Sequence, residues 1–290
     1  ATDHYNNEFT VKGKLIQTKT RLPKVIFVGG SNVAFGIDSK IISDSIKLPV
    51  FNAGLIAGLG MRYIFDSYEP YFRRGDIVIL MPEYDHFYGD NAYGNPETAG
   101  YLPYLSDFKP WLLNDKQLGV VSLGFLKTTL QIAVKGTYFK LLHTFKPAGN
   151  VYEYKMSGFN KWGDEVSHRT LPPNINNIGA YPIFGAYNAS YTQHLLNQVH
   201  HLRERGVRVI FFPPITSKNM VVLNHKQIVK IKRNLAAAGC AYAVSPDSLA
   251  YPDSLLYNTT YHLNAQGVAV NSQRLAGYLK LLLHSPFRKK

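Results

Sequence analysis

The repeated alternation of short apolar runs with helix-like segments is the feature that most constrains the fold. Continuous apolar runs predict strands that are buried on both faces. The five runs that we expect to form strands are "KVIFVGG" (24–30), "LPVFNAG" (48–54), "GDIVILMP" (75–82), "VRVIFFPP" (207–214) and "CAYAV" (240–244). Strand and helix repeated in this way are typical of a parallel sheet covered on both sides. We therefore predict a three-layer α/β/α fold of the flavodoxin-like type, with a central, mostly parallel five-stranded sheet.

The segments between these runs have the periodicity and the end signals of helices. Asp38 is a plausible cap for the first helix, and Gly206 is placed to end a later one. The ranges that we expect to be helical are 38–46, 60–74, 189–206, 224–238 and 264–284. With 46% hydrophobic residues, 290 residues suffice for a large core. We expect one domain spanning 1–290.

The middle of the chain, at about 84–187, breaks the alternation. It is rich in Tyr, Phe, Trp and Gly and contains one expected helix near 116–134. Long irregular segments in compact domains are usually functional or disordered, and the many aromatic residues favour order. We therefore interpret this region as an aromatic-rich insertion.

Ser31 lies where the first expected strand ends, in "VIFVGGSNVAFGIDS" (25–39). One interpretation is a capping residue in a tight strand-to-helix turn. The other is a nucleophile at the carboxyl edge of the sheet, where open α/β sheets bind ligands. A nucleophile requires a histidine, and His262 lies in a loop between the last expected strand and the closing helix. Topology therefore places Ser31 and His262 on the same edge of the sheet.

Three motifs resemble the SGNH, or GDSL-like, hydrolase superfamily: "VGGSN" (28–32), "RRGDIVILMPEYDHF" (73–87) and "YHLNAQG" (261–267). The resemblance is greatest to cell-envelope members, which include polysaccharide O-acetyltransferases and esterases and the D-alanyl-transfer proteins of teichoic acid. It implies that Ser31 is the nucleophile and His262 the general base. It further implies an oxyanion hole formed by the backbone of Ser31 and by Gly54 or Gly58, of which the spacing favours Gly58.

The chain departs from the superfamily pattern before the histidine. Thr259 stands where a catalytic Asp is expected, and Asn258 precedes it. An Asn or Thr oxygen can accept the imidazole N–H and fix its tautomer, but it does not stabilise the imidazolium as a carboxylate does. Asp253 is the nearest carboxylate in sequence, and it is better explained as a turn residue.

A second departure follows the third expected strand. An oxyanion-hole Asn is expected there, but the chain has Glu83 and Asp85. An ionised carboxylate cannot donate a hydrogen bond to an oxyanion. Glu83 either orients His262 in place of the missing Asp or is an ordinary residue bonded to a loop.

The expected activity is acyl-ester chemistry through a covalent acyl-serine, on an acyl-ester donor or an acetylated glycan of the cell envelope. Water as the acceptor gives an esterase and a sugar hydroxyl gives an O-acyltransferase, and the sequence does not separate the two. The alternative is a catalytically degenerate domain that binds an anionic glycan or scaffolds an envelope complex. The chemistry needs no cofactor, and no metal-ligand pattern is present in the sequence.

The charge of the chain predicts an acidic partner. The net charge is +13 and the isoelectric point is about 9.6, with basic groups at Lys226, Lys230 and Arg233 and at 288–290. An anionic polysaccharide or envelope surface fits this charge, whereas no nucleic-acid-binding module is recognisable. The resemblance implies an extracytoplasmic place, periplasmic or cell-surface. It also implies secretion or a membrane anchor in the full-length protein, and a membrane-bound acyl-donor partner protein is possible.

Overall fold

The fold is built on a parallel sheet, as predicted. A computed structural model describes residues 8–20, 23–105, 107–142, 156–174 and 178–284. The main sheet has four strands in the order β2-β1-β3-β4, and every neighbouring pair is parallel. Its strands are β1 (Val25–Gly29), β2 (Val50–Asn52), β3 (Ile77–Met81) and β4 (Arg208–Phe211).

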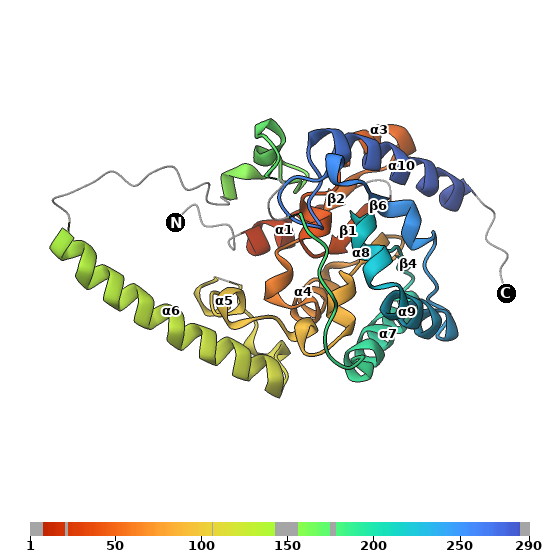
Figure 1. Cartoon of the computed structure of the whole chain (residues 1–290). Helices are drawn as coiled ribbons and strands as arrows, with labels where there is room; N and C mark the ends of the chain where they lie inside the picture. The colour runs from red at the N-terminus through yellow and green to blue at the C-terminus, as the bar shows by residue number, and fades with distance from the viewer. Residues whose placement is uncertain (1–7, 21–22, 106, 143–155, 175–177, 285–290) are drawn as a thin grey trace.

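Helices cover both faces of this sheet (Figure 1). Ile26 and Val28 of β1 belong to the apolar cluster on one face, whereas Val25 and Phe27 belong to the cluster on the other. The first face is covered by α1 (Glu8–Gln17), α4 (Met61–Tyr68), α7 (Ala189–Glu204) and α9 (His225–Ala237). The second is covered by α3 (Ser39–Ile46) and α10 (Ala265–His284). Alternate strand residues therefore point into two separate cores, because successive side chains leave a strand on opposite faces.

The prediction of a fifth strand in the main sheet is wrong. Residues 240–244 make one parallel bridge, between Tyr242 and Phe211, and Ala243 N–H donates to the Phe211 carbonyl at 2.8 Å. Pairing stops there because β4 runs into two prolines, which have no N–H to donate. Two further short strands form a separate parallel pair, β5 (Thr216–Ser217) and β6 (Ala250–Tyr251).

The predicted helix ends agree with the observed ones. Asp38 caps α3, since its Oδ1 accepts the Ile41 N–H at 3.0 Å. Gly206 follows α7 with a φ of +82°, a conformation that glycine adopts without strain. Four helices were not predicted, namely α1, α2 (Ser31–Ala34), α5 (Pro96–Ala99) and α8 (Lys218–Leu223).

The middle region consists mainly of short turns of helix and one long helix. That helix, α6 (Asp115–Leu142), contains the predicted range and continues past it. The shorter elements include η4 (Tyr84–Phe87), η5 (Asn91–Tyr93), α5 (Pro96–Ala99), η6 (Leu102–Tyr104), η7 (Pro110–Leu112), η8 (Met156–Gly158) and η9 (Ser167–Thr170). Residues 143–155 and 175–177 lie outside the described ranges.

Candidate functional site

The order of the strands indicates where on the carboxyl edge of the sheet a ligand is expected to bind. In a doubly wound sheet, ligands bind where the strand order reverses, which here is between β1 and β3. Ser31 comes two residues after β1, and Glu83 comes two residues after β3. Since β1 and β3 are paired in parallel, the two side chains leave the sheet side by side.

Ser31 is not a helix cap. It is the first residue of α2 (Ser31–Ala34), whose N-cap is Gly30, a residue without a side chain that could cap the helix. Instead, the Ser31 hydroxyl donates to Glu83 Oε1 at 3.1 Å. A Cβ atom on Gly30 would lie 2.5 Å from the same oxygen, so the glycine is needed for this approach. The capping interpretation of Ser31 is therefore replaced by a hydroxyl–carboxyl pair.

Glu83 is buried at the N-terminus of α2. Its Oε1 also accepts the backbone N–H of Asn32 at 3.1 Å. Burial raises the pKa of Glu83 to about 7, although the hydrogen bonds from Asn32 and Ser31 oppose the rise. At neutral pH the carboxyl is therefore partly protonated. We assign that proton to Oε2, since the Ser31 hydroxyl and the Asn32 N–H both reach Oε1; the Ser31 backbone N–H bonds the carboxyl as well. These contacts of Glu83 are with the Ser31 segment and not with the His262 ring, contrary to the interpretation that Glu83 orients His262.

His262 lies against the same helical turn. Its ring stacks on Phe35 with centroids 4.0 Å apart, and the Phe35 N–H donates to the Ser31 carbonyl at 2.9 Å. The imidazole Nδ1 lies 2.8 Å from Asn258 Oδ1. An amide oxygen only accepts, so we assign the ring proton to Nδ1, which leaves the lone pair on Nε2. Within the described residues, no partner of Nε2 is recorded.

The environment keeps the His262 imidazole neutral. The residue is buried, and burial lowers its pKa to about 3, with His168 adding to the effect. A neutral imidazole with an unoccupied Nε2 can accept a proton. Asn258 therefore takes the tautomer-fixing place that the sequence left open between Asn258 and Thr259.

Thr259 and Asp253 have other contacts. Thr259 Oγ1 accepts the Tyr261 N–H at 3.2 Å. Asp253 begins η12 (Asp253–Leu255) and accepts from Asn219 at 3.2 Å. Neither side chain has a described contact with the His262 ring. The turn interpretation of Asp253 agrees with the structure.

The two candidate oxyanion glycines differ in what their N–H groups do. The Gly54 N–H already donates to Asn52 Oδ1 at 2.9 Å, and its Cα packs against α2. Gly58 lies in the 3-10 helix η2 (Ala57–Leu59), where an early N–H has no intrahelical acceptor. It also lines a pocket together with Glu83. Of the two glycines, Gly58 therefore remains the candidate donor, because the Gly54 N–H is already bonded.

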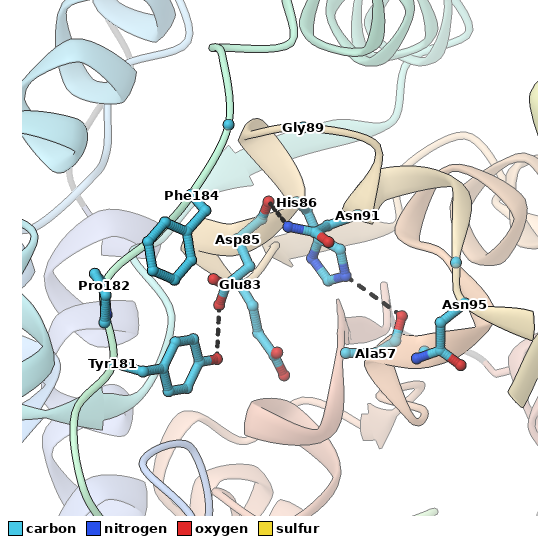
Figure 2. Close-up of a pocket in the computed structure, with 13 residues that line it drawn as sticks. Ala57, Glu83, Asp85, His86, Gly89, Asn91, Asn95, Tyr181, Pro182 and Phe184 are labelled. Carbon is cyan, nitrogen blue, oxygen red and sulfur yellow. Dashed lines mark hydrogen bonds between the residues drawn. The ribbon is translucent and has the colours of Figure 1, made fainter. Parts of the chain in front are cut away.

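The pocket has a volume of about 500 Å³ and opens beside Glu83 (Figure 2). Its lining combines acidic, amide and aromatic side chains with Ala57, Pro182 and four glycines, and no Lys or Arg is among its described residues. His86 is also in the wall, where burial lowers its pKa to about 4, so it carries no charge at neutral pH. The lining residues are Ala57, Gly58, Glu83, Asp85, His86, Gly89, Asn91, Gly94, Asn95, Tyr181, Pro182, Phe184 and Gly185. The pocket is thus neutral to negative inside a strongly basic protein.

Asp85 connects the pocket wall to the histidine loop. The hydroxyls of Tyr181 and Tyr261 both donate to Asp85 Oδ2, each at 2.9 Å. Tyr261 directly precedes His262 in the chain. These bonds tie the loop that carries the imidazole to the segment that carries Glu83, and sequence reasoning did not assign a role to either tyrosine.

A buried Glu165–His168 pair behind Phe35 was also not predicted. His168 Nδ1 bonds Glu165 Oε2, and His168 Nε2 lies 3.0 Å from the Leu263 carbonyl. The His168 ring is 4.9 Å from the Phe35 ring. The spacing of Glu and His three residues apart was the only signal in the sequence, and it lay in the irregular middle region.

No protein-family model matches the chain, and no curated protein is significantly similar to it. Within the described ranges, no three His, Cys, Asp or Glu side chains gather so as to hold a metal ion.

Proposed function

We propose that the protein performs serine-dependent acyl-ester chemistry, with Ser31 as nucleophile and His262 as general base. The observation that carries this proposal is the Ser31 hydroxyl, which does not cap its helix but faces a buried carboxyl at the ligand-binding edge of the sheet. The motifs that resemble SGNH hydrolases support the same roles.

In the proposed reaction, Ser31 Oγ bonds to the ester carbonyl carbon as its proton passes to His262 Nε2. The Gly58 N–H and the proton on Glu83 Oε2 donate to the resulting oxyanion, because a carboxyl with a pKa near 7 can remain a donor at neutral pH. The C–O bond to the alcohol then breaks, and the alcohol takes the proton from His262. The acyl-serine is released to water or to a sugar hydroxyl.

The lining of the pocket supports a neutral substrate group. Glu83 and Asp85 disfavour an anion there, whereas Asn95 and the rings of Tyr181 and Phe184 suit a sugar, whose hydroxyls form hydrogen bonds and whose apolar face packs on rings. Phe184 is 75% exposed at the mouth. We propose an acetylated envelope glycan whose neutral unit enters the pocket.

The charge of such a glycan would bind elsewhere. Lys226, Lys230 and Arg233 are exposed on α9, whereas the basic tail at 288–290 lies outside the described residues. An extracytoplasmic location and a membrane-bound acyl-donor partner belong to the same proposal.

A second candidate, a degenerate domain that binds glycan without turnover, is favoured by one observation. The Nδ1 partner of His262 is the Asn258 amide and not a carboxylate, so the imidazolium formed during catalysis would lack a counter-charge. Labelling by a fluorophosphonate, which reacts with activated serines, distinguishes the two candidates.

The decisive experiment treats the protein and its Ser31→Ala variant with the fluorophosphonate and measures hydrolysis of 4-nitrophenyl acetate. We expect labelling of Ser31 and a loss of at least about a thousandfold in kcat in the variant. Ser190→Ala is the matched control, because Ser190 is exposed on α7 away from the pocket. An unlabelled Ser31, or full activity in Ser31→Ala, would reject the enzyme proposal.

A further inference from the structure

The long helix α6 buries mostly polar and small residues and exposes apolar ones, which is the reverse of an ordinary surface helix. In the part whose side chains are described, its buried positions are Gln117, Val121, Gly124 and Thr128, which recur at helical spacing. Only one of these four carries an apolar side chain. Gly124 packs tightly on α5, since a Cβ atom there would lie 2.2 Å from the Pro96 carbonyl. The helix therefore attaches to the protein by a narrow stripe with little apolar surface.

The apolar residues of α6 are on its exposed side. Leu123, Leu126 and Leu130 are 56%, 57% and 56% exposed and form one stripe at i, i+3 and i+7. Leu118 and Phe125, seven residues apart, are 52% and 40% exposed on a second face, about a third of a turn around the helix from this stripe. Figure 1 shows α6 extending away from the sheet, with α5 beside its first half. An exposed leucine stripe of this kind marks an interaction surface.

The charge and the neighbouring aromatic residues indicate what covers this surface. The helix sequence has one acidic residue, Asp115, against four lysines, of which Lys116 and Lys127 pair with Asp90 and Glu97. The whole chain carries a net charge of +13. Trp111, just before the helix, is 76% exposed, and Tyr104 packs on Phe125 with ring centroids 5.3 Å apart. A basic helix with leucines on one side and flanking Trp and Tyr is typical of helices that lie in a membrane interface. Among the described residues, no helix is both long and apolar enough to cross a membrane.

We propose that α6 lies in the plane of an anionic lipid surface, with Leu123, Leu126 and Leu130 inserted among the acyl chains. The convex, aliphatic stripe suits a fluid bilayer, and the net positive charge attracts anionic headgroups. This proposal is independent of the catalytic one, because none of the α6 residues lines the pocket.

Co-sedimentation with vesicles tests the proposal. We expect the protein to bind vesicles of equimolar phosphatidylcholine and phosphatidylglycerol, and to bind pure phosphatidylcholine vesicles more weakly. The combined Leu123→Ser, Leu126→Ser and Leu130→Ser variant should bind the anionic vesicles at least about tenfold more weakly, because the buried apolar area is lost. The matched control carries Val222→Ser, Leu223→Ser and Leu281→Ser, three exposed apolar positions on α8 and α10. It should bind as the unmodified protein does.

Three outcomes would overturn the proposal. The first is an absence of vesicle binding, and the second is equal binding by the α6 variant and the unmodified protein. The third is a dimer in size-exclusion chromatography that the α6 variant abolishes while vesicle binding persists, which would make a second copy of the chain the occupant. Circular dichroism checks that the variants are folded, and these exposed positions leave both cores intact.

Discussion

Two buried imidazoles contact the ring of Phe35, and their ring nitrogens have different hydrogen-bond partners. His168 has partners on both ring nitrogens, the Glu165 carboxylate and the Leu263 carbonyl. His262 has an amide oxygen on Nδ1, and no partner of its Nε2 is recorded among the described residues. The site thus has a carboxylate, Glu83, that bonds a serine and an imidazole that bonds an amide. The conventional His–carboxylate pair, formed by His168 and Glu165, lies behind Phe35.

The difference separates a structural polar cluster from a chemical one. Burial alone would raise the pKa of Glu165, but hydrogen bonds from His168 and Ser167 outweigh it and lower the pKa. The hydrogen bonds of Glu165 and His168 are made within the protein, which leaves no group of the pair for a ligand. Around Ser31 burial dominates instead, so Glu83 keeps a proton near neutral pH and His262 loses one. Such opposed shifts at one site are typical of an acid and a base with separate roles.

The largest expected effect is a loss of activity when the His262 imidazole is removed. We expect His262→Ala to lower kcat for 4-nitrophenyl acetate by at least about a thousandfold, as expected for Ser31→Ala, because the two residues act as a unit in the proposed reaction. The unfolding temperature should also fall, because a buried ring that stacks on Phe35 is lost, so kcat is measured well below that temperature. His200→Ala, on the exposed side of α7, is the control. Full activity in His262→Ala would remove the general base from the mechanism.

Removing the His168 imidazole should lower the stability of the folded protein. We expect His168→Ala to lower the free energy of unfolding in urea by about 3–5 kcal/mol, because Glu165 remains buried without its partner. The folded fraction should keep its turnover number. A loss of about 0.5 kcal/mol, as at an ordinary surface site, would show that the pair is not structural.

The proton on Glu83 gives a pH test of the comparison. Because its pKa is raised to about 7 and the protonated form is the donor, turnover should fall as the pH rises through 7. The expected slope approaches tenfold per pH unit. Glu83→Gln, which keeps an N–H donor, should retain activity and lose this decline, whereas Glu83→Ala should lose activity. A decline that persists in Glu83→Gln would assign the titration to another group.

The smallest effect is expected from giving His262 the carboxylate that it lacks. Asn258→Asp places a negative charge at the atom that bonds Nδ1, which should raise the pKa of His262 and increase kcat by about threefold to tenfold. Thr259→Asp is the comparison, since its side chain faces the Tyr261 N–H and should have less effect. NMR titration of the His262 ring measures the pKa directly. A larger gain in Thr259→Asp would reassign the orienting position.

The sequence alone determined much of the framework, because its signals are local. Apolar runs gave β1 and β3, and the positions of Ser31 and Glu83 at their ends followed from the parallel order. The cap at Asp38 and the stop at Gly206 are also short-range effects of side chain and backbone. The prediction of a fifth strand was wrong because strand pairing depends on the partner strand. The two prolines that follow β4 have no N–H groups to donate to a fifth strand.

Only the tertiary structure decided which polar groups share a proton. Glu83 meets Ser31 across 52 positions of the chain, and Tyr261 meets Asp85 across 176. Burial then sets the pKa values of Glu83 and His262, and burial is a property of the packed cores rather than of any segment. The exposed stripe of α6 is similar, since its leucines would fit a core helix by sequence. Attachment through Gly124 turns them outward, because only a residue without a side chain allows that close contact with α5.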